Sequence, residues 1–206
     1  MDQDEFDRKQ KDFFNRICYE WASHPDSNRE SIDEMMDCFG IKGDEKILDV
    51  ATGIGVLIPS YVKRLTTGTV LGVDYTPNMI KLAKERYENG DYPNVHFREQ
   101  NIFTLEEKDE YDMIVCYSCF PHFLDHDGAV RILSEALRSG GRFIVCNLNY
   151  HHSDGGDRPK KGMEGMPEHR FITMPDLIAF IYKHGMTLEF VRNDDEMTVI
   201  KAVKKT

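Results

Sequence analysis

Apolar and polar residues follow two different periods along this chain. Apolar residues recur every three or four positions over residues 3–22 and again over 28–39, which predicts two helices. From residue 46 onward, short apolar runs alternate with further helical segments. The runs predict five strands, over residues 46–51, 69–73, 95–97, 111–116 and 142–147.

The segments between these runs complete the predicted architecture. Helices are expected over residues 56–65, 76–87, 129–137 and 175–184, and a β-hairpin over 187–192 and 196–203. Strands alternating with helices are typical of an α/β fold with a parallel sheet. We therefore predict a Rossmann-like, seven-stranded, mostly parallel sheet that closes with an antiparallel C-terminal hairpin strand.

We expect residues 1–206 to form one domain. Residues 1–40 are predicted to be an N-terminal cap of two helices, and 41–206 the Rossmann-like core. Within the core, residues 148–170 are polar and rich in glycine and proline. A loop of this length in a compact domain is usually functional, so we predict that it forms a lid.

Charge and composition exclude several classes of partner. The formal net charge is −10, which disfavours a nucleic-acid backbone as the partner. No apolar run approaches the ~18 residues of a membrane span, and the charged N-terminus lacks a signal-peptide core. Five cysteines, an odd number, favour reduced thiols over a disulfide framework. These features predict a cytoplasmic protein, either a monomer or a homodimer.

A glycine turn after the first predicted strand is the strongest local signal. The sequence KILDVATGIGVL at residues 46–57 places Gly53 and Gly55 between a strand and a helix. In this arrangement backbone N–H groups and a helix N-terminus face a ligand. Asp49 at the strand end would repel a pyrophosphate and attract an ammonium group.

Further polar residues follow the next strands. Asp74 ends the second strand, Asn101 follows the third, and residues 116–118 end the fourth. Ligands of such sheets bind beyond the carboxyl ends of the strands, where the strand order reverses. These residues are therefore expected around one crevice.

Together these segments resemble the class I S-adenosylmethionine-dependent methyltransferases. The chain is most similar to the small-molecule branch that includes the ubiquinone/menaquinone biosynthesis methyltransferases. The resemblance covers nearly the whole chain and rests on DFFNRICYEW, ILDVATGIGVL, VLGVDYTPNMIKLAKER, YDMIVCYSCFPHF and ALRSGGRFIVCNL. The chain departs from the family pattern at Ala51, where the first glycine stands, at Asn101, usually acidic, and at Ser139, usually proline.

The resemblance implies S-adenosyl-L-methionine as the cofactor and S-adenosyl-L-homocysteine as its product. Asp49 would attract the methionine ammonium group and Asp74 would accept the ribose hydroxyls. Asn101 would accept from the adenine amino group, although it could instead cap its own backbone. The cofactor-binding residues implied are Asp49, Ala51, Thr52, Gly53, Gly55, Asp74, Tyr75, Asn101, Ile102, Cys116 and Tyr117.

The methyl acceptor is expected to be a small molecule. Candidate substrate-binding residues are Tyr19, Trp21, His24, His122, His151 and His152. His122 is also the candidate general base, with a packing or capping role as the alternative. The histidine and cysteine spacings match no zinc pattern, so no metal site is predicted.

Two other functions remain open at the level of sequence. A nicotinamide-dependent oxidoreductase could use a similar sheet, although Asp49 and the absence of GxGxxG argue against it. A non-catalytic S-adenosylmethionine-binding or regulatory module would keep the same pocket without turnover. Methyl transfer imposes few fixed side chains, because a sulfonium leaves as a neutral thioether and needs no acid.

Overall fold

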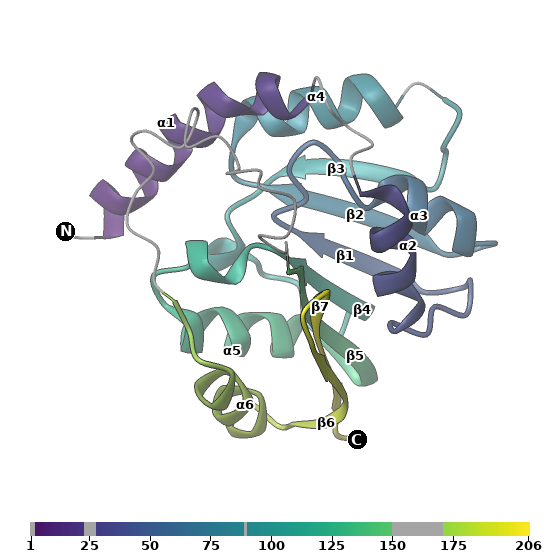
Figure 1. Cartoon of the computed structure of the whole chain (residues 1–206), viewed down its shortest axis with the longest axis vertical. Helices are drawn as coiled ribbons and strands as arrows, with labels where there is room; N and C mark the ends of the chain where they lie inside the picture. The colour runs from purple at the N-terminus through teal and green to yellow at the C-terminus, as the bar shows by residue number, and fades with distance from the viewer. Residues whose placement is uncertain (1–2, 23–27, 89, 150–170) are drawn as a thin grey trace.

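A seven-stranded sheet with helices on both faces forms the protein in the computed structural model (Figure 1), which describes residues 3–22, 28–88, 90–149 and 171–206. The strands are β1 (Lys46–Val50), β2 (Thr69–Asp74), β3 (Val95–Glu99), β4 (Tyr111–Tyr117), β5 (Leu137–Leu148), β6 (Met186–Asn193) and β7 (Met197–Lys204). The α-helices are α1 (Gln3–Ala22), α2 (Arg29–Asp37), α3 (Ile58–Arg64), α4 (Pro77–Tyr87), α5 (His126–Ala136) and α6 (Met174–Lys183). Two short 3-10 helices are η1 (Ile102–Thr104) and η2 (Phe120–His122).

The sheet has the strand order β3-β2-β1-β4-β5-β7-β6. Strands β1 to β5 pair in parallel, whereas β7 runs antiparallel to both of its neighbours, β5 and β6. The predicted fold class is confirmed, including the antiparallel strand of the C-terminal hairpin. The strand order reverses between β1 and β4, which is where parallel sheets of this kind open a ligand crevice.

The largest difference from the predicted elements lies at β5. The sequence favoured a helix to residue 137 and a turn at 139–141, but β5 begins at Leu137. Its pairing with β4 shifts in register, because Tyr111 faces Leu137 while Met113 faces Arg142. The extra residues form a bulge in which Gly140 has φ +75°. The pair Gly140–Gly141 therefore lies inside an irregular strand and not in a turn that precedes the strand.

Alternate residues of the central strands serve two different cores. Ile47 packs in a cluster with α2, α3 and α4, whereas Leu48 packs in a second cluster with α5 and α6. Both side chains are fully buried. Because successive strand residues point to opposite faces, a parallel strand covered on both sides reads as a continuous apolar run. This explains why the strands were visible in the sequence.

Helix α1 lies beside α4 rather than on a face of the sheet (Figure 1). Asn15 links the two helices, because its side-chain oxygen accepts from the Asn78 backbone N–H at 3.1 Å and its carbonyl accepts from the Asn78 side chain at 3.1 Å. Lys11 also pairs with Glu99 at the end of β3, at 3.2 Å. These contacts hold α1 near the carboxyl ends of the strands.

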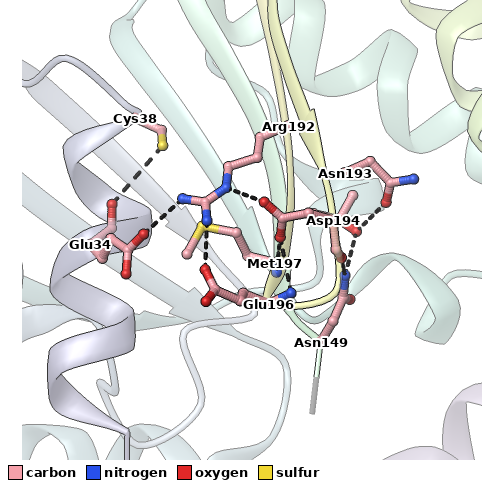
Figure 2. A network of polar contacts seen from close by, with 9 residues as sticks. Glu34, Cys38, Asn149, Arg192, Asn193, Asp194, Glu196 and Met197 are labelled. Carbon is pink, nitrogen blue, oxygen red and sulfur yellow. Dashed lines mark hydrogen bonds and ion pairs between the residues drawn. The ribbon is translucent and has the colours of Figure 1, made fainter. Parts of the chain in front are cut away.

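A charged network fixes the C-terminal hairpin to α2 (Figure 2). The guanidinium of Arg192 pairs with Glu34 at 2.9 Å, with Asp194 at 2.5 Å and with Glu196 at 2.7 Å. The Asn149 side chain donates to the Asp194 carbonyl at 2.7 Å. The network therefore joins three segments that are distant in sequence.

Several sequence expectations fall outside the described residues. The predicted lid is described only at its first two residues, Leu148 and Asn149. The candidate substrate-binding residues His24, His151 and His152 lie outside the described residues. Across the described ranges, no helix combines the length and the apolar character needed to cross a membrane.

Gly55 is expected to be the least replaceable residue of the glycine turn. It has φ +81°, and an added Cβ would stand 2.7 Å from the Tyr87 ring, which other aromatic rings hold in place. Gly55→Ala should lower the free energy of unfolding by roughly 2–4 kcal/mol, through left-handed backbone strain plus overpacking.

Gly140→Ala is the matched control, because Gly140 also has positive φ but an added Cβ meets nothing within 4 Å. It should cost only the backbone strain, roughly 1–2 kcal/mol. Urea unfolding of both variants measures the difference, and equal losses would show that the Tyr87 contact contributes nothing.

Candidate functional site

A pocket opens at the carboxyl ends of the parallel strands, beside the point where the strand order reverses. Its wall is formed by one face of α1 and by the segments that follow β1, β2, β3 and β4. The sequence-predicted residues that line it are Trp21, Asp49, Ala51, Thr52, Gly53, Asp74, Tyr75, Asn101, Ile102, Tyr117 and His122. Most of the predicted cofactor residues are therefore brought together.

The turn after β1 is built from left-handed backbone conformations. Ala51 has φ +52° and Gly53 has φ +57°. This conformation suits glycine and strains alanine, so the glycine that the family pattern has at position 51 would relieve strain. The Thr52 backbone N–H donates to the Val73 carbonyl at 3.0 Å, which fastens the turn to β2. The turn is thus held in place by both strands that flank the pocket.

Asp49 is the most deeply buried acid of the pocket, with 1% of its surface exposed. Its carboxylate accepts from the Thr52 hydroxyl at 2.6 Å and, more weakly, from the Tyr61 hydroxyl at 3.5 Å. Burial raises the pKa of Asp49 to about 7, against the lowering effect of the two hydroxyls. A positively charged ligand group would lower this pKa and stabilise the charged form.

Asp74 is the second buried acid, at the end of β2. Its two carboxylate oxygens accept from the Gly53 backbone N–H at 3.0 Å and from the Thr76 backbone N–H at 2.8 Å. Burial raises the pKa of this carboxyl above its ordinary value, and the two N–H donors oppose the rise. Each oxygen keeps a further lone pair, so the group can still accept hydrogen bonds from ligand hydroxyls.

The pocket is negative in character. Asp7, Asp49 and Asp74 line it, and no lysine or arginine does so among the residues that the structure describes. A phosphate-bearing ligand needs cationic or N–H donors, whereas this wall offers carboxylates. The electrostatics therefore favour a cationic or neutral ligand with hydroxyl groups.

Aromatic side chains also line the pocket. The Phe14 ring lies edge-on to His122 at 5.0 Å between centroids and lies 6.0 Å from the Trp21 ring. Phe103 and Phe123 pack edge-to-face at 6.2 Å on the same pocket. The pocket thus combines a polar end with an apolar end that can exclude water.

Among the predicted residues that the structure describes, three do not line the pocket. Gly55 turns toward Tyr87, Cys116 is fully buried in the core, and Tyr19 is 51% exposed. Helical geometry explains Tyr19, since it projects from α1 away from the face that carries Trp21. Cys116 and Cys119 also form a Cys-x-x-Cys pair, which the inference from the cysteine count wrongly took to be absent, and Cys119 does line the pocket.

Asn101 lines the pocket, but its side chain caps the local backbone, which was the alternative to adenine binding. Its side-chain oxygen accepts from the Phe103 backbone N–H at 3.0 Å and so caps η1. The Asn101 carbonyl accepts from Gln100 and from Thr104. The side-chain oxygen is therefore already engaged, which leaves the backbone of the buried Ile102 and the second lone pair of Asn101 for a ligand.

A family model for a methyltransferase domain matches residues 41–179, which is more than half of the chain. The chain belongs to this methyltransferase family. The matched region holds β1 to β5 and every lining residue outside α1, so the family assignment covers the acidic end of the pocket.

Among curated proteins, this methyltransferase-family chain is similar to the ubiquinone/menaquinone biosynthesis C-methyltransferase UbiE of Vibrio parahaemolyticus. The two are 30% identical over 117 residues, which cover 55% of this chain and 45% of the relative. The match thus spans about half the length of that relative.

Solved structures of methyltransferases share the fold. A SAM-dependent methyltransferase from Aquifex aeolicus is 16% identical, with a TM-score of 0.72 over 90% of this chain and 97% of that one. Magnesium protoporphyrin IX methyltransferase from Synechocystis PCC 6803, solved with bound SAM, is 14% identical, with a TM-score of 0.68 over 95% of each chain. At these identities the likeness concerns the fold.

Sequence reasoning placed Trp21 of the N-terminal helix at the site but missed the other residues that α1 contributes to the pocket. Asp7, Gln10 and Phe14 line it, although Phe14 was interpreted only as part of an apolar stripe. The available signal was spacing, because residues 7, 10, 14 and 21 recur at helical intervals on one face. No group of three potential metal ligands occurs within the described part of the chain.

Asp49 should make the empty methyltransferase-family protein less stable as the pH rises. Its folded-state pKa of about 7 lies above the ordinary value of 3.8, so the folded state holds the proton more tightly and stability falls between about pH 4 and pH 7. Asp49→Asn should therefore raise the free energy of unfolding at pH 8 by up to about 4 kcal/mol more than it does at pH 4.

Denaturant unfolding at both pH values measures this effect, and Asp195→Asn on the exposed hairpin turn serves as the control for removing one carboxylate. A stabilisation by Asp49→Asn that is the same at both pH values would contradict the burial argument.

Proposed function

We propose that this protein is an S-adenosyl-L-methionine-dependent methyltransferase that acts on a small-molecule acceptor. The observation that carries the proposal is the pair of buried carboxylates, Asp49 and Asp74, which one turn joins at the ends of the adjacent strands β1 and β2. A cationic amino-acid nucleoside matches this pair, since it offers an ammonium group to one acid and hydroxyls to the other. The family membership and the absence of lysine and arginine from the described pocket wall support the same ligand.

The residues of the acidic end would each bind one part of the cofactor. Asp49, with the Thr52 hydroxyl on its carboxylate, would face the ammonium group. Asp74 would accept from the ribose hydroxyls, while Tyr75 would pack beside the adenine. The backbone of Ile102 would address the edge of the base. Because Gly53 already donates to Asp74, the turn orients that carboxylate before a ligand arrives.

S-adenosyl-L-methionine supplies a methyl group on a sulfonium, from which a neutral thioether leaves. The protein therefore needs no acid for the leaving group, and its work is to align the acceptor and exclude water. Phe14, Trp21 and Phe123 supply apolar surface for both tasks. The same surface favours an acceptor with an apolar or aromatic body over a peptide or a nucleic acid.

His122 would act as a general base for an acceptor that must lose a proton. It lines the pocket from η2, and the edge-on contact with Phe14 at 5.0 Å limits where its ring can lie. An imidazole titrates near neutral pH and is suited to this role. Cap closure by α1, a lid at residues 148–170, a cytoplasmic location and a monomeric or homodimeric state remain predictions from the sequence.

A binding comparison and a turnover assay test the proposed function. Calorimetry should show that S-adenosyl-L-homocysteine binds at least about tenfold more tightly than NADH, and Asp49→Asn should weaken the former by roughly tenfold through loss of a charge-assisted contact. Labelled S-adenosyl-L-methionine should then transfer methyl to at least one member of a panel of quinols, phenols, thiols and amines.

The outcomes separate the competing functions. Tighter binding of NADH would support an oxidoreductase, and tight S-adenosyl-L-homocysteine binding without transfer to any acceptor would support a non-catalytic module.

His122→Gln should lower kcat roughly 100-fold for an acceptor whose attacking atom must lose a proton, because general-base catalysis contributes about 10²–10⁴ in rate. The affinity of His122→Gln for S-adenosyl-L-homocysteine should stay within about twofold of the wild-type affinity. Phe14→Leu is the control for loss of the ring contact, and its affinity should also stay within about twofold. Stopped assays across pH 6–9 measure both quantities. An unchanged kcat, or an equal loss of affinity, would assign His122 to packing.

A further inference from the structure

Gln10 is a buried polar residue on a helix whose outer surface is charged. Only 3% of its surface is exposed, and it lines the pocket beside Tyr75. The Tyr75 hydroxyl donates to the Gln10 side-chain oxygen at 3.2 Å. The Gln10 amide nitrogen Nε2 is buried and has no hydrogen-bond partner among the described residues. One half of this amide is therefore satisfied and the other half is not.

An unpaired buried N–H group is unusual and unfavourable. Leaving such a donor without an acceptor costs about 1–3 kcal/mol, and most buried polar groups in native proteins have a partner. Leucine or methionine would fill a similar space on α1 without this cost. The placement of an unsatisfied amide in the wall of a pocket indicates that a ligand supplies the missing acceptor.

The neighbours of Gln10 indicate which acceptor fits. Tyr75 follows directly after Asp74, whose carboxylate only accepts hydrogen bonds when charged. A hydroxyl group can donate to a carboxylate and accept from an amide at the same time.

We propose that Gln10 binds a ribose hydroxyl of the nucleoside and thereby makes α1 part of the cofactor site. This inference rests on the proposed function. It assigns a role to a helix outside residues 41–179, the region that the methyltransferase family model matches. The hydroxyl that Asp74 accepts from the sheet side is then held from the helix side by Gln10.

Docking of α1 and binding of the cofactor are coupled in this arrangement. In the empty protein α1 is held by Asn15 on Asn78, by Lys11 on Glu99 and by its apolar face. A bound nucleoside adds a contact between the sheet and α1. An interaction that stabilises the docked helix therefore also strengthens cofactor binding, and cofactor binding stabilises the docked helix. Trp21 reports this state, because it lies on α1, lines the pocket and is the single tryptophan of the chain.

The test compares two ligands and two variants of the full chain. The ligands are S-adenosyl-L-homocysteine and its analogue without the two ribose hydroxyls. Gln10→Met keeps the length of the side chain and removes the amide, so it should weaken S-adenosyl-L-homocysteine binding about five- to tenfold, in line with one lost hydrogen bond. The analogue should bind Gln10→Met and the wild type equally within about twofold.

Asn15→Ala is the control for the docking of α1, because Asn15 contacts Asn78 and does not line the pocket. It should weaken the binding of both ligands, because it loosens the whole helix, whereas Gln10→Met should weaken only the binding of the ligand with ribose hydroxyls. The Trp21 emission of each unliganded variant shows whether α1 is docked, and thermal unfolding shows whether the variant is folded.

Each outcome decides the proposal. A loss in Gln10→Met that is specific for the ligand with ribose hydroxyls supports it. An equal loss for both ligands, or no loss for either, overturns it and assigns Gln10 to the packing of α1. Failure of the wild type to bind S-adenosyl-L-homocysteine contradicts the proposed function itself, which distinguishes the two failures.

Discussion

Two carboxylates buried at the ends of adjacent parallel strands are the constraint on which the site depends. Burial disfavours the charge on Asp49 and on Asp74, and each acid also disfavours the charge on the other. The arrangement persists because the same short turn supplies a hydroxyl to the first acid and an N–H to the second. The parallel pairing of β1 with β2 sets how far apart the acids stand, so the sheet itself determines the spacing of the recognition groups.

The rest of the fold supports this acidic end and completes it. Helices on both faces bury the central strands, which leaves their carboxyl ends as the place where irregular backbone and polar groups gather. Helix α1 then contributes a wall without belonging to either layer. The sheet holds the charged groups, while α1 supplies aromatic surface and Gln10.

The sheet and its acidic end could be predicted because their signals are local. Strands buried on both faces give apolar runs, and Asp49, Gly53 and Asp74 stand at fixed distances from those runs. The bulge at Gly140 could not be predicted, since it depends on how β5 pairs with β4. Gln10 and Phe14 were missed for a similar reason. Their spacing shows that they share a helix face, but only tertiary packing shows that this face meets the pocket.

The position of β7 has a consequence for how the chain folds. β7 follows β6 in sequence yet lies between β5 and β6. Until β7 arrives, β5 presents an open edge of unpaired backbone groups to solvent, and β6 has no partner at all. Such an edge is a template for pairing with other chains. The final hairpin therefore covers the edge of β5, and the Arg192 network anchors that hairpin to α2.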